Sequence, residues 1–178
     1  MRVVAGQLRG RRLSAPPGRT TRPTADRVRE ALFSILGDMD GLRVLDLFAG
    51  SGALGIEALS RGASEAVFVD ISRRATVTVE ANLESLGLAA EVHQRDAMAF
   101  LGRAAGSVPF DLVFLDPPYD WASRLAGPLA ERLPAILTED ARIVTESDKR
   151  SPLLMPFSLV RERTYGDTRI AVHRMETG

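Results

Sequence analysis

The segment FLDPPYD, residues 114–120, ends an apolar run with an acid, two prolines and an aromatic ring. The carboxylate of Asp116 and the carbonyl oxygen of Pro117 could accept the two N–H bonds of an exocyclic amine, and the proline rings would hold these acceptors rigid. Tyr119 offers a flat face for a base rotated out of a nucleic acid, a stacking contact worth about 1–3 kcal/mol. The alternative is structural, because two prolines also suffice to end a strand.

A glycine-rich loop, DLFAGSGALG, covers residues 46–55. Gly50 and Gly52 would let the backbone turn sharply and approach a ligand closely. Together with Gly55 they satisfy GxGxxG, the phosphate-binding fingerprint of nicotinamide enzymes. That match alone is weak, since a tight strand-to-helix turn without a ligand would use the same residues. The ligand class therefore depends on the neighbouring acids.

Three of these acids suit a nucleoside that carries an amino acid. Asp46 precedes the glycines, where a carboxylate would attract a cationic group and repel a pyrophosphate. Asp70 could accept bonds from both hydroxyls of a ribose, and Asp96 from an adenine amino group. S-adenosylmethionine offers an ammonium, a ribose diol and an exocyclic amine, one partner for each acid. For any single acid, a helix cap or a solvated strand end explains the residue equally well.

The elements that must position these residues follow an α/β pattern. From Arg43 onward, short apolar runs alternate with helical segments, which predicts a parallel sheet flanked by helices. Strands are expected at residues 44–48, 66–70, 90–95, 111–115 and 141–147, and helices near residues 54–62, 72–86 and 122–133. Residues 157–175 predict a closing hairpin with a tight turn at Gly166 and Asp167. Because ligands bind at the carboxyl ends of parallel strands, we expect the four acids around one crevice. Trp121 is expected to be packed.

The amino-terminal part is basic and differs from the rest. Residues 2–14 predict a hairpin, and residues 15–23 a linker rich in proline and glycine. A helix should follow, with Thr24 as its cap, and run to about Leu36. The arginines that could grip RNA phosphates are Arg9, Arg11, Arg12 and Arg22. The alternative is a solvated arginine-rich surface, since Lys149 is the single lysine among 23 basic residues.

Composition restricts the class of protein further. A chain of 178 residues with 45% hydrophobic and 26% charged residues is typical of one globular domain, and no apolar run approaches the roughly 20 residues of a membrane span. With no cysteine, thiolate metal sites and disulfides are excluded, and the two histidines lie far apart in the sequence. We expect a cytoplasmic monomer without a metal site.

The motifs in this order resemble class I S-adenosylmethionine-dependent methyltransferases that modify exocyclic amines. More narrowly, the chain resembles the RsmD family, bacterial enzymes that methylate N2 of one guanine in 16S ribosomal RNA. The segments that carry the resemblance are GQLRGRRL (6–13), RPTADRVREALFSIL (22–36), DLFAGSGALGIEALSRGA (46–63) and FLDPPY (114–119).

The resemblance implies a Rossmann-like α/β fold with a seven-stranded, mostly parallel sheet whose last strand is antiparallel. It also implies a division into an amino-terminal basic hairpin and linker, residues 1–21, and a class I methyltransferase domain, residues 22–178. The expected partner is 16S rRNA within an assembled or assembling small subunit. Carried over by motif, Asp46, Gly50, Gly52, Asp70 and Asp96 would hold S-adenosyl-L-methionine, and Asp116, Pro117 and Tyr119 the guanine.

Three other functions stay open at this point. An adenine-N6 methyltransferase of DNA or RNA would share DPPY and the glycine loop, but would not need the arginine hairpin in this form. A non-catalytic RNA-binding assembly factor could retain the fold. A nicotinamide oxidoreductase would explain the glycines and leave DPPY without a role.

Overall fold

The computed structural model describes residues 1–17, 26–118 and 121–175. Its strands are β1 (Arg43–Asp46), β2 (Glu65–Asp70), β3 (Glu91–Gln94), β4 (Phe110–Leu115), β5 (Leu137–Asp148), β6 (Ser158–Tyr165) and β7 (Thr168–Arg174). Its helices are α1 (Asp26–Leu36), α2 (Ala53–Ser60), α3 (Arg73–Leu86), α4 (Ala97–Ala104) and α5 (Ala122–Arg132), and a 3-10 turn, η2 (Leu133–Ile136), joins α5 to β5.

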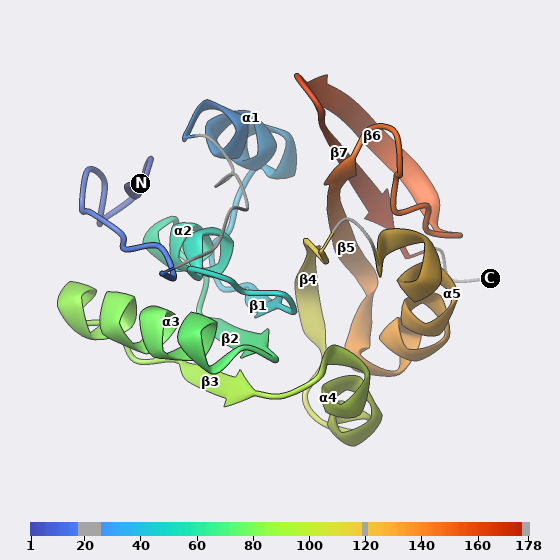
Figure 1. Cartoon of the computed structure of the whole chain (residues 1–178), viewed down its shortest axis with the longest axis horizontal. Coiled ribbons are helices and arrows are strands. Elements are labelled where there is room, and N and C mark those ends of the chain that lie inside the picture. Colours follow the sequence, from blue (N-terminus) through green and yellow to red (C-terminus); the bar gives the residue numbers. More distant parts are fainter. Residues whose placement is uncertain (18–25, 119–120, 176–178) are drawn as a thin grey trace.

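The strands form one seven-stranded sheet in the order β3-β2-β1-β4-β5-β7-β6. The pairs from β3 to β5 are parallel, and β7 pairs antiparallel with both β5 and β6 (Figure 1). The chain therefore reverses direction only in β7, its last strand. The predicted fold, a mostly parallel seven-stranded sheet with an antiparallel last strand, is confirmed.

Helices cover both faces of the sheet, which explains the apolar runs of the central strands. Figure 1 shows α1, α2 and α3 on one side and α4 and α5 on the other. On the first side Phe33, Phe68 and Phe114 belong to one buried cluster, and on the second side Leu101 and Val113 belong to another. Strands buried on both faces need apolar residues at successive positions, which is what β2 and β4 show.

The sequence pattern did not predict α4, and the ends of several predicted elements differ from those in the structure. The α4 segment AMAFLGRA spans only eight residues, too few for a clear helical period, and Asp96 starts it by accepting a hydrogen bond from the Ala99 N–H (3.0 Å). The first strand ends at Asp46 rather than at residue 48. The hairpin turn is confirmed: Gly166 has φ of 63° between β6 and β7. Thr24, the expected cap of α1, lies outside the described residues.

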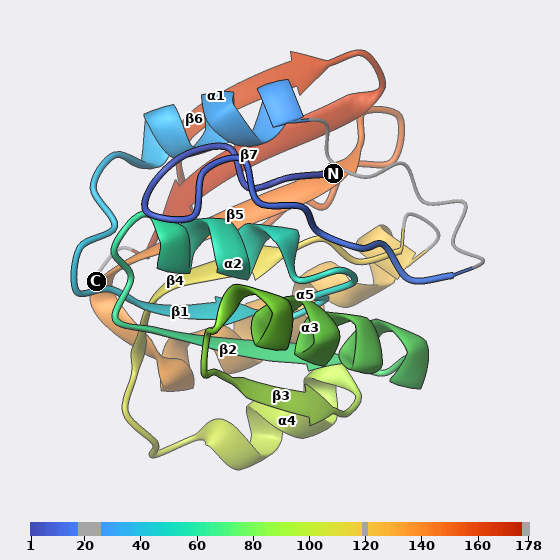
Figure 2. The same ribbon diagram turned by 90° about the vertical axis from the view of Figure 1, so that its left-hand side faces the viewer.

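The amino-terminal segment forms a turn-rich loop that is closed by one antiparallel bridge between Arg2 and Arg12. The Val3 N–H donates to the Arg11 carbonyl (2.9 Å), and the Leu13 N–H to the Met1 carbonyl (3.0 Å). Val3 and Leu13 are buried in the same cluster as α1. Figure 2 shows this segment running along α1 and α2, so it is packed on the body of the protein. The proposed division at residue 21 stays a prediction.

No helix in the described part of the chain has the length and apolarity to cross a membrane.

Candidate active site at the carboxyl edge of the sheet

The structure brings the four predicted acids to one edge of the sheet. Asp46 and Asp70 are the last residues of β1 and β2, and Asp116 directly follows β4. Asp96 comes two residues after β3. β1 pairs with β2 on one side and with β4 on the other, with Asp46 opposite Phe68 and Phe114. The glycine loop and the Asp116-Pro117 segment therefore follow neighbouring strands.

Asp46 is a buried carboxyl with a perturbed pKa. It is 2% exposed, and its Oδ2 accepts a hydrogen bond from the Gly55 N–H in α2 (3.1 Å). Burial raises the pKa of Asp46 to about 7, and the nearby charge of Asp70 adds to this, while the Gly55 hydrogen bond opposes it. No cationic side chain among the described residues pairs with it. A cationic ligand group is what would favour its ionised form.

Asp70 holds the glycine loop in place. Its Oδ2 accepts from the Gly50 N–H (3.0 Å) and its Oδ1 from the Ser72 N–H (2.8 Å). Ser72 stands at the cap position of α3 as expected, but its hydroxyl makes no capping bond. Carboxylate oxygens can each accept more than one bond, so these two contacts do not by themselves exclude a diol. The structure thus fixes Asp70 by two backbone groups at the mouth of the loop.

The three glycines of GxGxxG have different reasons to be glycine. Gly50 and Gly52 have φ of 58° and 78°, the left-handed region that L side chains rarely adopt. Gly55 lies inside α2, where an added Cβ would stand 2.3 Å from Cε1 of Phe68. The third glycine therefore serves close packing of α2 on β2 and is not required for ligand approach.

Asp96 is exposed, and its Oδ1 caps α4. The structure therefore shows the helix cap that was the alternative to a ligand-binding role. This cap role uses one of the bonds that a carboxylate can accept. Asp116 is half-buried and Pro117 is buried, directly beyond the end of β4. Tyr119 lies outside the described residues, so its stacking role stays a prediction.

Trp121 contradicts the expectation that it is packed, since it is 45% exposed. Its backbone N–H donates to the Pro118 carbonyl (2.9 Å). The residue directly precedes Ala122, the first buried residue of α5. An exposed indole therefore borders the segment predicted to receive a base.

Sequence reasoning missed Glu146, an acid in β5. Leu115 is opposite Thr145 in the parallel pair of β4 and β5, and Asp116 and Glu146 are the residues that follow this last pair. Glu146 is 5% exposed, and its charge acts on the fully buried Arg29 of α1. Burial lowers the pKa of Arg29, while the neighbouring carboxylates raise it. An acid in the middle of an apolar strand, ARIVTES, was the available signal.

A second set of missed residues anchors the amino-terminal segment to α2. Glu57 is fully buried and accepts from the N–H groups of Val4 (2.8 Å) and Ala5 (2.9 Å). The Ser60 hydroxyl accepts from the Leu8 N–H (3.0 Å) and donates to the Ala5 carbonyl (2.6 Å). Both acceptors belong to the helix that begins at the glycine loop, so α2 carries the segment.

Asn82 joins the end of this segment to the glycine loop. Its Oδ1 accepts from the Ser14 N–H (2.8 Å), and its Nδ2 donates to the carbonyls of Ser14 (3.0 Å) and Ser51 (2.9 Å). One buried amide in α3 therefore connects residue 14 with the loop at residues 50–52. Nothing in the sequence pattern pointed to this residue, because the contact joins positions 68 apart.

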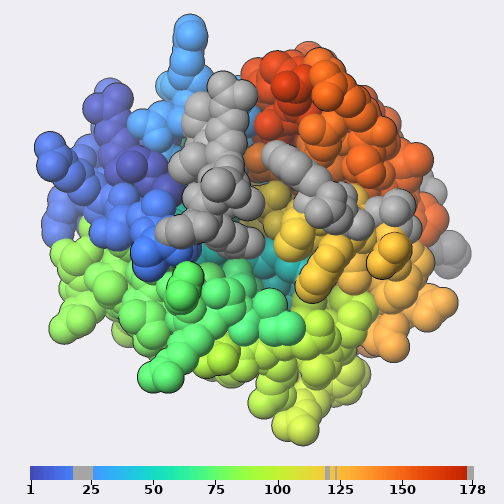
Figure 3. Space-filling view, viewed as in Figure 1, coloured from blue at the N-terminus to red at the C-terminus, as the bar shows by residue number. Residues whose placement is uncertain are grey.

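The predicted RNA-binding arginines lie on the amino-terminal segment. Arg9, Arg11 and Arg12 are exposed, and Nη2 of Arg11 donates to the Ser85 carbonyl of α3 (2.6 Å). Figure 3 shows this segment, in blue, at the surface beside α3 in green. Arg22 lies outside the described residues. Among the residues that the structure describes, no group of three His, Cys, Asp or Glu could hold a metal ion.

Comparisons with known proteins agree with this geometry. A family model described as "Conserved hypothetical protein 95" matches residues 1–174. "Ribosomal RNA small subunit methyltransferase D" of Escherichia coli K12 is 37% identical and covers 99% of this chain and 90% of its own length. A solved structure from Escherichia coli superposes with a TM-score of 0.84 at 36% identity, covering 100% of this chain and 99% of that one.

A more distant solved structure shares the fold. It is an RNA methyltransferase from Salinibacter ruber in complex with S-adenosyl-L-homocysteine, with a TM-score of 0.67 and 19% identity over 88% of this chain and 95% of that one. At this identity the likeness concerns the sheet order and the helices around it.

Proposed function

The chain belongs to the family described as conserved hypothetical protein 95, and from this membership we propose that it is an S-adenosylmethionine-dependent methyltransferase of small-subunit (16S) ribosomal RNA. We further propose that the methyl group goes to the exocyclic N2 amine of a guanine. The protein acts as a cytoplasmic monomer on an assembled or assembling small subunit.

The proposed cofactor fits the acids of this edge. Asp46 is a buried carboxyl with a pKa of about 7 and no cationic partner among the described residues, which suits the ammonium group. Gly50 and Gly52 leave the backbone free of Cβ atoms where the cofactor approaches. Asp70 would accept from the ribose diol and Asp96 from the adenine amino group. When bound, the cofactor supplies a methyl group already activated by its sulfonium.

The proposed amine-binding residues follow the strand beside that loop. Asp116 would accept one N–H of the guanine amine and the Pro117 carbonyl the other, which keeps the nitrogen lone pair aimed at the methyl carbon. Tyr119 would stack on the extruded base. The observation that carries the proposal is the pairing of β1 with β4, because it puts the glycine loop and the Asp116-Pro117 segment on adjacent strand ends.

The experiment that tests the substrate class offers three substrates in parallel. Labelled methyl groups from S-adenosylmethionine are supplied with small ribosomal subunits, naked 16S RNA and double-stranded DNA. We expect incorporation into the ribosomal substrates and none into DNA. Preferential methylation of DNA would replace this proposal by the adenine methyltransferase. Binding of ribosomal RNA without any transfer would favour a non-catalytic assembly factor.

A further inference from the structure

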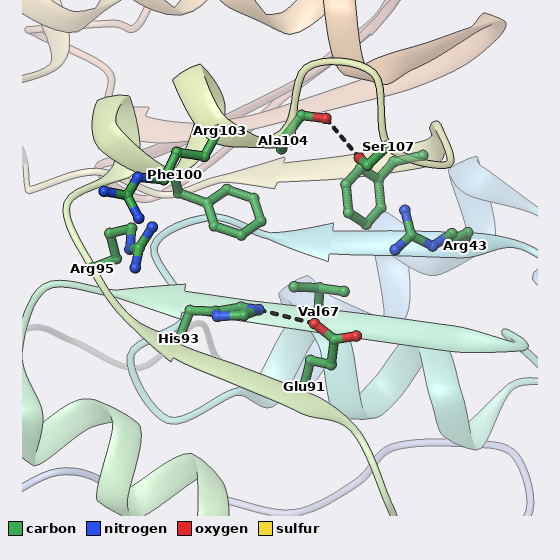
Figure 4. Close-up of a pocket in the computed structure, with 10 residues that line it drawn as sticks. Arg43, Val67, Glu91, His93, Arg95, Phe100, Arg103, Ala104 and Ser107 are labelled. Atoms are coloured by element: carbon green, nitrogen blue, oxygen red, sulfur yellow. Dashed lines mark hydrogen bonds and ion pairs between the residues drawn. The ribbon is translucent and has the colours of Figure 1, made fainter.

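A separate cleft of about 350 Å³ lies between α4 and the sheet. Its walls come from β2, β3, α4 and the loop from α4 to β4 (Figure 4). Its charged and aromatic lining includes Arg43, Glu91, His93, Arg95, Phe100 and Arg103. None of the four acids at the carboxyl edge is among its lining residues, and the cleft lies on the α4 side, opposite α2. Its volume falls in the range of about 300–1,000 Å³ that is usual for small-molecule sites.

Most of the charges along this cleft are already compensated. Arg43 makes an ion pair with Glu65 (2.8 Å), bonds to the Val108 carbonyl, and lies 4.1 Å from the centre of the Phe110 ring. His93 and Glu91 form a hydrogen-bonded pair (3.0 Å). These contacts fix the end of the cleft near Ser107 and the floor along β3.

Two arginines are the exception. Arg95 follows β3 and Arg103 lies in the last turn of α4, and neither guanidinium group has an ion pair or hydrogen bond among the residues that the structure describes. Figure 4 shows both side chains toward the same end of the cleft, beyond Phe100, and away from Arg43 and Ser107. The cleft therefore has an uncompensated positive end, and two guanidinium groups suit a phosphate, which they can hold bidentately.

An aromatic wall stands beside this positive end. The rings of His93 and Phe100 are 5.3 Å apart and tilted by 45°. Phe100 and His93 are both half-buried, so each keeps part of its ring accessible to the cleft. A flat ring against which a base can stack, next to a phosphate-binding pair, is the combination used for single-stranded nucleic acid.

We propose that this cleft binds one nucleotide of the RNA substrate outside the methylated base, with its phosphate at Arg95 and Arg103 and its base against Phe100. Arg95 precedes Asp96, so the positive end opens at the same strand edge as the candidate active site. The RNA source rests on the proposed function, whereas recognition of a nucleotide phosphate rests on the cleft alone. A free mononucleotide has the same chemistry and is the second source to be distinguished.

The test compares two double variants with the wild-type protein. The cleft variant is Arg95→Ala with Arg103→Ala. The control is Arg132→Ala with Arg163→Ala, which removes two exposed arginines from α5 and β6 that do not line the cleft. Binding of a labelled 16S rRNA fragment is measured at several salt concentrations without cofactor, and binding of guanosine 5′-monophosphate by calorimetry. Circular dichroism and cofactor affinity establish that each variant is folded.

The cleft variant should bind RNA roughly tenfold or more weakly, and its salt dependence should fall by about 0.7 in log–log slope, the value for one lost phosphate contact to a single strand. The control should keep wild-type affinity. If the cleft variant loses affinity for RNA alone, an RNA nucleotide is the occupant of the cleft. If it loses affinity for guanosine 5′-monophosphate as well, the cleft also binds the free mononucleotide. A cleft variant that binds both as the control does overturns the inference, as does a wild-type protein that binds neither.

The outcome is independent of the methyl-transfer result. A wild-type protein that binds RNA through the cleft but transfers no methyl group would refute the proposed function and keep this inference. If the wild-type protein transfers methyl groups normally and the cleft variant binds RNA as the control does, the proposed function is kept and this inference is refuted.

Discussion

At the scale of single residues, the acids at the carboxyl edge have different environments and should contribute separately. Asp46 and Asp70 are buried and tied to the glycine loop, whereas Asp116 is half-buried beyond the neighbouring strand. The residues proposed for the cofactor and those proposed for the amine therefore belong to different strands and can be altered one at a time.

Asp116→Ala should leave cofactor affinity close to that of the wild type and lower methyl transfer by at least about a hundredfold, because it removes an acceptor aimed at the reacting amine. Calorimetry with S-adenosylmethionine and a transfer assay on 16S RNA measure the two quantities. Asp140→Ala, an exposed acid at the start of β5, is the matched control. Full transfer activity in the Asp116 variant would refute its assignment.

Cofactor affinity should depend on pH through Asp46. The raised pKa of about 7 means that the free protein carries Asp46 largely protonated below pH 7, and a bound ammonium requires the ionised form. Affinity should therefore fall by roughly tenfold between pH 8 and pH 6. Calorimetry at pH 6, 7 and 8 checks this, with Asp46→Asn as the variant that should bind weakly and show no such pH dependence. If the cofactor affinity of the wild-type protein does not change between pH 6 and pH 8, this prediction is wrong.

Residue types and their order were sufficient to predict that Asp46, Asp70, Asp96 and Asp116 lie at one edge of the sheet, because each closes or follows a strand that the sequence pattern already indicated. Glu57, Asn82 and Glu146 could not be predicted in the same way. Each acquires its role from a partner far away in the chain, such as the N–H groups of Val4 and Ala5 for Glu57. The exposure of Trp121 likewise could not be predicted, because the residue stands at the start of α5 and only the packing of that helix decides which side chains it buries.

At the scale of elements, the amino-terminal segment depends on α2. Gly6 has φ of 81°, and a Cβ there would stand 1.8 Å from the Ser60 carbonyl oxygen. Gly10 has nearly the same φ, 83°, but a Cβ there would meet no atom within 4 Å. The two glycines share their backbone conformation and differ in the space around them.

Gly6→Ala should therefore lower the free energy of unfolding by about 2 kcal/mol or more, because it adds a steric conflict to the left-handed strain, whereas Gly10→Ala should cost about 1 kcal/mol. Urea unfolding of both variants measures these values, and limited proteolysis shows whether residues 1–14 detach. Equal destabilisation by the two substitutions would show that the contact with Ser60 does not hold the segment.

Strands that are buried on both faces could be predicted from the sequence, whereas short elements could not. β2 and β4 are buried on both faces, so each appears in the sequence as a continuous apolar run. The α4 helix has eight residues, of which Ala97 and Leu101 are buried, too few to establish a period. Asp96, which caps this helix, was interpreted as a ligand-binding acid, so the start of α4 was not recognised in the sequence.

At the scale of the whole molecule, formal net charge is zero, yet the arginines of residues 9–12 are gathered at one surface. The backbone of this segment, rather than its arginine side chains, makes the bonds to Glu57, Ser60 and Asn82. RNA binding and cofactor binding should therefore be separable.

Neutralising Arg9, Arg11 and Arg12 together by alanine should weaken RNA binding and reduce its salt dependence, since up to three phosphate contacts are lost, while cofactor affinity stays unchanged. A salt series of RNA binding and calorimetry with S-adenosylmethionine measure the two effects. If cofactor affinity falls as much as RNA affinity does, the separation is wrong, and the connection through Asn82 to Ser51 would be the path to examine.

The alternation of strands and helices predicted a parallel sheet, but the order of the strands could not be predicted, because the pattern of apolar runs does not say which strands pair. The structure supplies the pairing of β1 with β4, on which the proposed reaction depends.

The central claim is that this edge of the sheet transfers a methyl group to the exocyclic amine of a guanine. The most direct measurement is mass spectrometry of the nucleosides released from 16S RNA after reaction with the wild-type protein and labelled S-adenosylmethionine. We expect the label to be recovered in N2-methylguanosine and to be lost with Asp116→Ala. Label in N6-methyladenosine, or on a ribose, would contradict it.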